Sequence, residues 1–197
     1  SSYALVGFNR GAEELEASFK YLIMGAVGSV FILLGIAMLY GSVGSLNIAD
    51  ISVRVSEVSD QSFILLSTAL FIVGFGLKAA FIPFHSWLPD AHSSAPTPIS
   101  AMLSGVLIKV LGIYALSRIL FNGLNLPDLS AQILTWIGAG SMFIGGMIAL
   151  GQDDLKRLLA YSSISQMGYI TLGLGMGGIF IAKDKPAIAT LALIGGI

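Results

Sequence analysis

The stretch Tyr21–Tyr40 reads YLIMGAVGSVFILLGIAMLY and contains no charged residue. A helix that spans a bilayer needs about 20 mostly apolar residues, which is the length of this stretch. The whole chain has the same character, because 55% of its 197 residues are hydrophobic and only 11% are charged. A typical soluble domain has about a quarter of its residues charged. The sequence therefore predicts an integral membrane protein, in agreement with a mean hydropathy of +0.88.

The charged residues divide the rest of the chain into further apolar stretches. After a polar connector over 41–60, we expect membrane spans over 61–92 (broken near Pro83), 97–120, 129–151, 158–182 and 187–197, the last of them truncated. The connections are short, so residues 1–197 are predicted to form one transmembrane domain, an all-α polytopic helix bundle. Because the chain lacks a starting Met and its last span is short, we expect an internal segment of a longer membrane subunit.

The composition excludes several classes of function. A net charge of −1 argues against a nucleic-acid binder, whose Lys and Arg would cluster on one face. The absence of cysteine excludes a disulfide framework, an Fe–S cluster and a thiolate zinc site. Two His and one Asp between 85 and 92 lack a convincing metal-ligand pattern, so we expect no metal and no other cofactor. No span offers a nucleophile–base pair, so we expect no catalytic site in the chain itself.

Two lysines, Lys78 and Lys109, lie inside apolar stretches. At about 1.5 Å per helical residue, both are roughly 20–25 Å from the turn near His92, on two adjacent antiparallel helices. A lysine at the centre of a membrane helix costs about 2.5–3.5 kcal/mol on insertion scales and usually faces a cavity or a partner. Snorkelling to the headgroups is the alternative, and this depth disfavours it. The sequence therefore favours a functional role for both lysines, and proton relay is the chemistry that suits them.

The segment Phe81–His85, FIPFH, contains a helix-breaking proline one turn after Lys78. Pro83 removes a backbone donor and clashes with the preceding turn, so we expect the helix to break there. Freed carbonyls inside a membrane are tolerated only within protein or beside water. A hydrated gap beside Lys78 is therefore one interpretation, and a simple packing kink is the other.

Titratable side chains follow the break. His85, Asp90 and His92 are candidates to carry protons between the membrane surface and the gap, because histidine titrates near neutral pH. Asp90 and His92 equally suit an ordinary solvated loop. Trp87, between them, is most simply an anchor at the membrane interface.

Small and polar residues accompany Lys109 and the fifth span. With α-helical periodicity, Gly105 and Gly112 lie beside Lys109 on one face, and Ser104 lies on roughly the same side. Such a face leaves room for a neighbouring helix or for a file of water. Gln166, in the polar first half of the fifth span, is a candidate to line the same wet path, although helix bridging is the commoner use of such residues.

Three segments together resemble a known family. They are 78–92 (KAAFIPFHSWLPDAH), 95–101 (APTPISA) and 154–163 (DLKRLLAYSS). They are similar to the antiporter-like subunits of respiratory complex I, of membrane-bound hydrogenases and of Mrp-type cation/proton antiporters. The resemblance implies a fragment of a 14-helix fold, beginning at the end of the family's fifth helix and stopping within its eleventh.

The resemblance also implies roles for individual residues. In the family, the broken seventh helix carries a lysine that matches Lys78, and the eighth helix supplies a lysine that matches Lys109. Some relatives have histidine where Ser104 or Gln166 stands here. The family's fifth-helix glutamate and twelfth-helix lysine or glutamate fall outside this sequence, and the loop over 153–157 is implied to lie in the cytoplasm.

These observations lead to a functional expectation with alternatives. We expect proton translocation, via buried lysines on a hydrated axis, by a subunit of a redox-driven complex of the complex I or membrane-bound hydrogenase type. The alternative is a subunit of an Mrp-type Na⁺/H⁺ antiporter without redox coupling, and a third interpretation is a purely structural membrane subunit. The expected partners are other membrane subunits, the lipid bilayer, protons and, for the alternative, Na⁺. The expected location is a cell membrane or an inner membrane of mitochondrial type.

Overall fold

The computed structural model describes residues 2–8, 11–58, 61–125 and 128–195, and every regular element in these ranges is helical. Five helical segments are long and apolar enough to cross a membrane: Ala12–Val43, Gln61–Ala79, Thr97–Gly123, Asp128–Leu150 and Leu155–Ala182. The predicted all-α, multi-pass membrane bundle is confirmed. The end of the predicted span 187–197, residues 196–197, lies outside the described residues.

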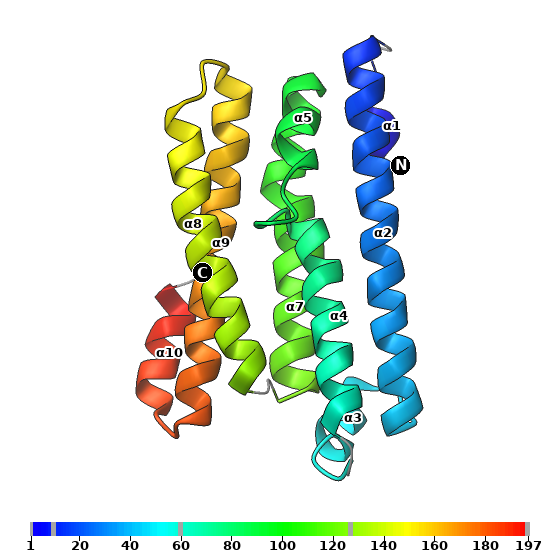
Figure 1. The fold of residues 1–197 in the computed structure, drawn as a ribbon, viewed down its shortest axis with the longest axis vertical. Helices are drawn as coiled ribbons and strands as arrows, with labels where there is room; N and C mark the ends of the chain where they lie inside the picture. Colours follow the sequence, from blue (N-terminus) through cyan, green and yellow to red (C-terminus); the bar gives the residue numbers. More distant parts are fainter. Residues whose placement is uncertain (1, 9–10, 59–60, 126–127, 196–197) are drawn as a thin grey trace.

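The helices stand roughly parallel to one long axis (Figure 1). Helix α2 (Ala12–Val43), with the short α1 (Ser2–Val6) beside its upper part, forms one edge of the bundle. The pair α8 (Asp128–Leu150) and α9 (Leu155–Ala182) forms the other edge, and α10 (Pro186–Gly195) packs against α9. The centre is occupied by the broken helix and by the helical run that follows it.

The broken helix consists of two pieces separated by an irregular segment. Helix α4 (Gln61–Ala79) rises to mid-height, and α5 (Trp87–Ser94) continues above it after the loop of residues 80–86 (Figure 1). Ala80, directly after α4, has a left-handed backbone with φ of 55°, and the Ile82–Pro83 peptide bond is cis. The break predicted near Pro83 is therefore present, and it begins at Ala80, three residues before the proline.

The third predicted span differs from an ordinary α-helix. It starts as α6 (Thr97–Met102) and continues as the π-helix η1 (Leu103–Tyr114), the single turn α7 (Ala115–Ser117) and a second π-helical stretch, η2 (Arg118–Gly123). A π-helix pairs each N–H with the carbonyl five residues earlier, so its side chains follow a longer period than in an α-helix. This period decides which residues share a face with Lys109.

Glycines bring α8 and α9 into backbone contact. A Cβ atom added to Gly138 would collide with the backbone of Leu172, and one added to Gly168 would collide with the backbone of Met142. Small residues at such positions are the usual means by which membrane helices approach closely, since lipid provides no hydrophobic force between them. The α8–α9 pair is therefore packed backbone to backbone, as is the α2–α4 pair at Gly28 and Gly74.

The polar connector over 41–60 contains a short helix that sequence reasoning missed. Helix α3 (Ile48–Arg54) begins where the Asn47 side chain accepts a hydrogen bond from the N–H of Ala49 at 3.0 Å. Asp50 lies in its first turn and Arg54 in its last, which matches the direction of the helix dipole.

Candidate functional site

The side chain of Lys78 lies in the last turn of α4 and is half-buried. It lines a pocket of about 80 Å³ together with Leu77 of the same helix and residues of α1, α2, α5 and η1: Tyr3, Tyr21, Gly25, Trp87, Leu107, Ile108 and Leu111. Among the described residues, Lys78 has no salt-bridge or hydrogen-bond partner. The pocket therefore places an unpaired ammonium group between aromatic and aliphatic side chains.

Three aromatic rings, from α1, α2 and α5, wall one side of this pocket. Tyr21 stacks on Trp87 with ring centroids 4.5 Å apart and an interplanar angle of 10°. The Tyr3 ring packs edge-on against the Tyr21 ring, with the two ring centroids 4.5 Å apart. A Cβ atom at Gly25 would lie only 2.6 Å from the Tyr3 hydroxyl, so glycine is needed there to leave room for the ring.

Two side chains satisfy backbone groups that the helix break frees. The Trp87 indole Nε1–H donates to the carbonyl oxygen of Leu77 at 2.8 Å, and the hydroxyl of Ser141 on α8 accepts from the backbone N–H of Ile82 at 2.9 Å. Ser141 is fully buried. Protein groups therefore pair two of the backbone positions at the break, for which the sequence left a hydrated gap and a packing kink open.

The interpretation of Trp87 as an interfacial anchor is wrong. The residue is 2% exposed, stacked on Tyr21 and bonded to the last turn of α4. A tryptophan at the membrane interface and a tryptophan buried in the bundle both pair the indole N–H and cover the ring. Sequence composition alone therefore does not distinguish an interfacial anchor from a buried tryptophan.

Lys109 lies on η1 at the level of Lys78, because Leu107, Ile108 and Leu111 line the Lys78 pocket. Its own side chain, however, is exposed on the surface of the described bundle. The two lysines thus sit on adjacent helices but point into different surroundings.

The expected face Gly105–Lys109–Gly112 does not exist as one surface. A Cβ atom at Gly112 would lie 2.7 Å from the Cβ of Ala79, whereas Gly105 faces open space. Gly105 and Lys109 are exposed and Gly112 is buried. The expectation assumed α-helical periodicity, and the π-helical hydrogen bonding of η1 turns Gly112 away from Lys109 and toward α4.

The two histidines after the break are turned into the protein. His92 is 3% exposed and its Nδ1 is hydrogen-bonded to the hydroxyl of Ser100 in α6. His85 is half-buried, with its ring 6.3 Å from that of Tyr161. Within the described ranges, Nδ1 of His85 and Nε2 of His92 are buried without a hydrogen-bond partner. These two ring nitrogens are therefore enclosed by protein and do not face solvent in this structure.

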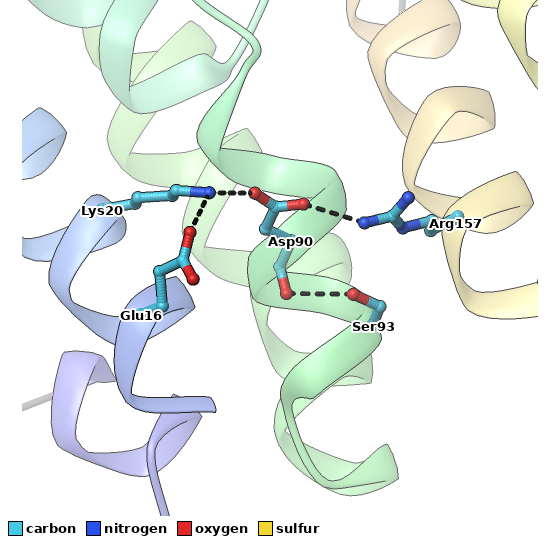
Figure 2. Close-up of polar contacts among 5 residues, drawn as sticks. All are labelled: Glu16, Lys20, Asp90, Ser93 and Arg157. Carbon is cyan, nitrogen blue, oxygen red and sulfur yellow. Dashed lines mark hydrogen bonds and ion pairs between the residues drawn. The ribbon is translucent and has the colours of Figure 1, made fainter. Parts of the chain in front are cut away.

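Asp90, on α5, links this helix to α2 and α9 (Figure 2). Its carboxylate contacts Lys20 of α2 at 2.9 Å and Arg157 of α9 at 3.1 Å, and Lys20 also contacts Glu16 at 2.8 Å. All four side chains are partly exposed. Asp90 is thus an anchoring point of α5 as well as a candidate proton carrier.

Lys156 holds the other end of α5. Its ammonium group donates to the carbonyl oxygens of Ser93 at 3.4 Å and Ala95 at 2.9 Å. These carbonyls lie at the C-terminus of α5, where unpaired acceptors and the negative end of the helix dipole favour a cation.

Polar recesses surround this charged end. A recess of about 590 Å³ lies between Glu13, Glu14, Thr97, Asp154 and Lys156, among others, and one of about 220 Å³ lies beside Lys20 and Asp90. Both recesses are bordered by Glu13, Ser93, Ser94 and Arg157. Water can therefore come within one residue of the buried His92.

The remaining candidates lie apart from Lys78. Ser104 forms a hydrogen bond of 2.7 Å with Ser163 of α9, and so bridges η1 and α9. Gln166 is exposed on α9. Sequence reasoning missed Ser141, Lys20 and Arg157 as parts of the site, since their partners lie 59 to 70 residues away along the chain. No group of three or more potential metal ligands is found within the described ranges.

Comparisons with known proteins place this architecture. Residues 1–188 match the family described as NADH:quinone oxidoreductase/Mrp antiporter, TM. The chain belongs to this family. The match includes every candidate residue from Lys78 to Gln166, as the sequence motifs predicted.

Proteins with similar sequences and structures come from different complexes. NADH-quinone oxidoreductase subunit N of Desulforudis audaxviator is 41% identical over 91% of this chain and 36% of its own length. An archaeal membrane-bound sulfane sulfur reductase chain is 32% identical, with a TM-score of 0.83 over 98% of this chain and 41% of its own. A chain of the Mrp complex from Dietzia sp. is 28% identical, with a TM-score of 0.79 over 99% of this chain and 38% of its own. The chain thus spans about two fifths or less of the length of these family members.

Proposed function

We propose that this chain is the proton-conducting part of an antiporter-like subunit in a redox-driven membrane complex, in a cell membrane, with Lys78 and Lys109 as proton carriers. The observation that carries this proposal is the position of Lys78, a half-buried lysine without a partner in the described chain, beside a helix break in the middle of the bundle. Unpaired charge at such depth is costly and marks ion pathways. Family membership and the 41% identity to a NADH-quinone oxidoreductase subunit support the redox-linked assignment.

The proposed mechanism is electrostatic. Two unit charges about 7–10 Å apart interact by roughly 1.7–2.4 kcal/mol at an effective dielectric constant of about 20. About 1.4 kcal/mol corresponds to a tenfold change in an equilibrium. A charge change next to Lys78 therefore alters its proton occupancy about tenfold or more, and Lys78 in turn acts on Lys109. His85, Asp90 and His92 connect the polar recesses to the break, and Ser104 and Gln166 lie toward α9.

Proton uptake by proteoliposomes that contain the complete assembly tests this proposal. We expect Lys109→Ala to lose most of the proton uptake while subunit assembly and electron transfer persist. Lys183→Ala is the matched control, because Lys183 is an exposed lysine at the turn between α9 and α10, and it should pump like the wild type. Unchanged pumping in Lys109→Ala would contradict the proposal and favour a structural subunit.

A Na⁺/H⁺ antiporter is the second candidate, favoured by the TM-score of 0.79 to a chain of an Mrp complex. The two functions differ in their driving force. An antiporter dissipates an imposed pH gradient when Na⁺ is added without any electron donor, whereas a redox-driven pump requires the donor. Adding Na⁺ to proteoliposomes with a preset pH gradient therefore distinguishes them.

A further inference from the structure

The break between α4 and α5 is held from two sides by side chains that come from different elements. Trp87, the first residue of α5, reaches back to the carbonyl of Leu77, next to Lys78. Ser141, from the middle of α8, reaches the N–H of Ile82 across the helix interface. One bond fixes the end of α4, and the other fixes the loop that leads away from it.

These two bonds replace pairs that a continuous helix would make. In an uninterrupted α-helix the Leu77 carbonyl would accept from the N–H of residue 81, and the Ile82 N–H would donate to the carbonyl of Lys78. With no competing water in hydrocarbon, an unpaired backbone group costs several kcal/mol. If either side chain is removed, the loop must recruit water or rewind toward α4, and both changes reach Lys78 directly.

Packing around the break leaves little freedom otherwise. Phe81 is fully buried, and a Cβ atom at Gly76 would lie 2.7 Å from its ring. Phe84 packs against Phe81 with ring centroids 6.4 Å apart. Packing thus holds the loop at Phe81, whereas Pro83 and Ser86 are exposed, so the hydrogen bond at Ile82 is the contact that fixes the middle of the loop.

We propose that Ser141 and Trp87 are positioning residues for Lys78. By holding the chain open between Ala79 and Trp87, they fix the backbone on both sides of the lysine and thereby its proton exchange. This inference rests on the proposed proton-carrying function of Lys78. It assigns a role to α8, which contributes no titratable side chain to the pathway.

The test uses the full-length subunit in its complete assembly, with Ser141→Ala and Trp87→Phe. Phe keeps an aromatic ring for stacking on Tyr21 but lacks the indole N–H. Ser67→Ala is the matched control, because Ser67 is also a fully buried serine, bonded to the Phe63 carbonyl within α4 and far from the break. Amide hydrogen exchange over 80–86 and the pH dependence of proton pumping are measured for each variant.

We expect both variants to exchange faster over 80–86 and to shift the midpoint of the pumping pH profile by about half a unit to one unit, as the loss of one buried hydrogen bond implies. Ser67→Ala should change neither. Unchanged exchange would overturn the inference, and so would faster exchange with an unshifted pH profile, since that outcome is the mark of a merely structural bond. Lys78→Ala, measured alongside, tests the proposed function separately: wild-type pumping in that variant would refute the function itself.

Discussion

The two lysine-bearing helices of this protein disturb the regular helix in opposite ways. Near Lys78 the helix is interrupted, and side chains from Trp87 and Ser141 pair the freed backbone groups. Near Lys109 the helix continues without interruption, but its hydrogen bonding is π-helical. The interruption lies beside the pocket that Lys78 lines, and the π-helical hydrogen bonding turns Gly112 toward α4 and away from Lys109. Backbone groups of an irregular membrane helix can thus be paired in two ways. Side chains of other elements bond to them, or the helix changes to π-helical hydrogen bonding.

The largest expected effect is a difference in thiol labelling between the two faces of η1. The chain contains no cysteine, so a single introduced thiol can be labelled selectively. Val106→Cys and Ile108→Cys place single thiols at positions that are 54% and 2% exposed. If the Lys109 face lies on the proposed hydrated axis, we expect a water-soluble maleimide to label Val106→Cys about tenfold faster or more than Ile108→Cys, because a thiol buried in the protein reacts only after an opening that costs more than about 1.4 kcal/mol. A Val106→Cys thiol that faces lipid in the span Thr97–Gly123 would label as slowly as the buried one. Equal labelling rates would therefore contradict a hydrated axis on the Lys109 face of η1.

The next largest expected effect is a loss of stability on substitution of Gly112, where η1 packs against Ala79 of α4. Gly112→Ala adds a methyl group against Ala79, and overpacking of this kind costs about 1–3 kcal/mol. Gly105→Ala adds the same methyl group to the same helix in open space, where alanine stabilises a helix by up to about 1 kcal/mol. Thermal unfolding of the purified assembly compares them. A comparable loss in Gly105→Ala would mean that the Lys109 face is tightly covered in the full-length subunit.

The second piece of the broken helix, α5, is anchored at its C-terminus by Lys156. Removing this anchor tests how much it stabilises α5. Lys156→Met removes the donor for the carbonyls of Ser93 and Ala95, and we expect a loss of about 1–2 kcal/mol in stability. Lys185→Met is the matched control in the exposed turn before α10. Faster hydrogen exchange confined to α5 in Lys156→Met would locate the effect, and equal stability of the two variants would contradict it.

The smallest expected effect is at Asp90. Asp90→Asn weakens contacts with Lys20 and Arg157, both of which are about half exposed. Exposed ion pairs contribute little and are screened by salt. We therefore expect a slightly lower Tm at low ionic strength that returns to the wild-type value at about 1 M salt, where the Debye length is about 3 Å. A large loss that salt does not remove would show that Asp90 acts through something other than these pairs.

The sequence predicts the features of this fold that depend on local physics. Uninterrupted apolar stretches locate the spans, and Pro83 locates the break because proline cannot continue the helix. The direction of Lys109 was not predictable, since π-helical hydrogen bonding is not encoded in apolar periodicity. Neither were the partners of the break: a serine such as Ser141 among the small residues of α8 looks like any packing residue until the tertiary structure brings it to Ile82.

The order in which the bonds of the break become available has a consequence for biogenesis. Ile82 leaves the ribosome 59 residues before Ser141, and Asp90 leaves it 67 residues before Arg157. The α8–α9 hairpin, whose contact depends on its own glycines, can associate as soon as both helices are inserted. During synthesis, the backbone N–H of Ile82 therefore has no bond to Ser141 until α8 has been inserted beside the break.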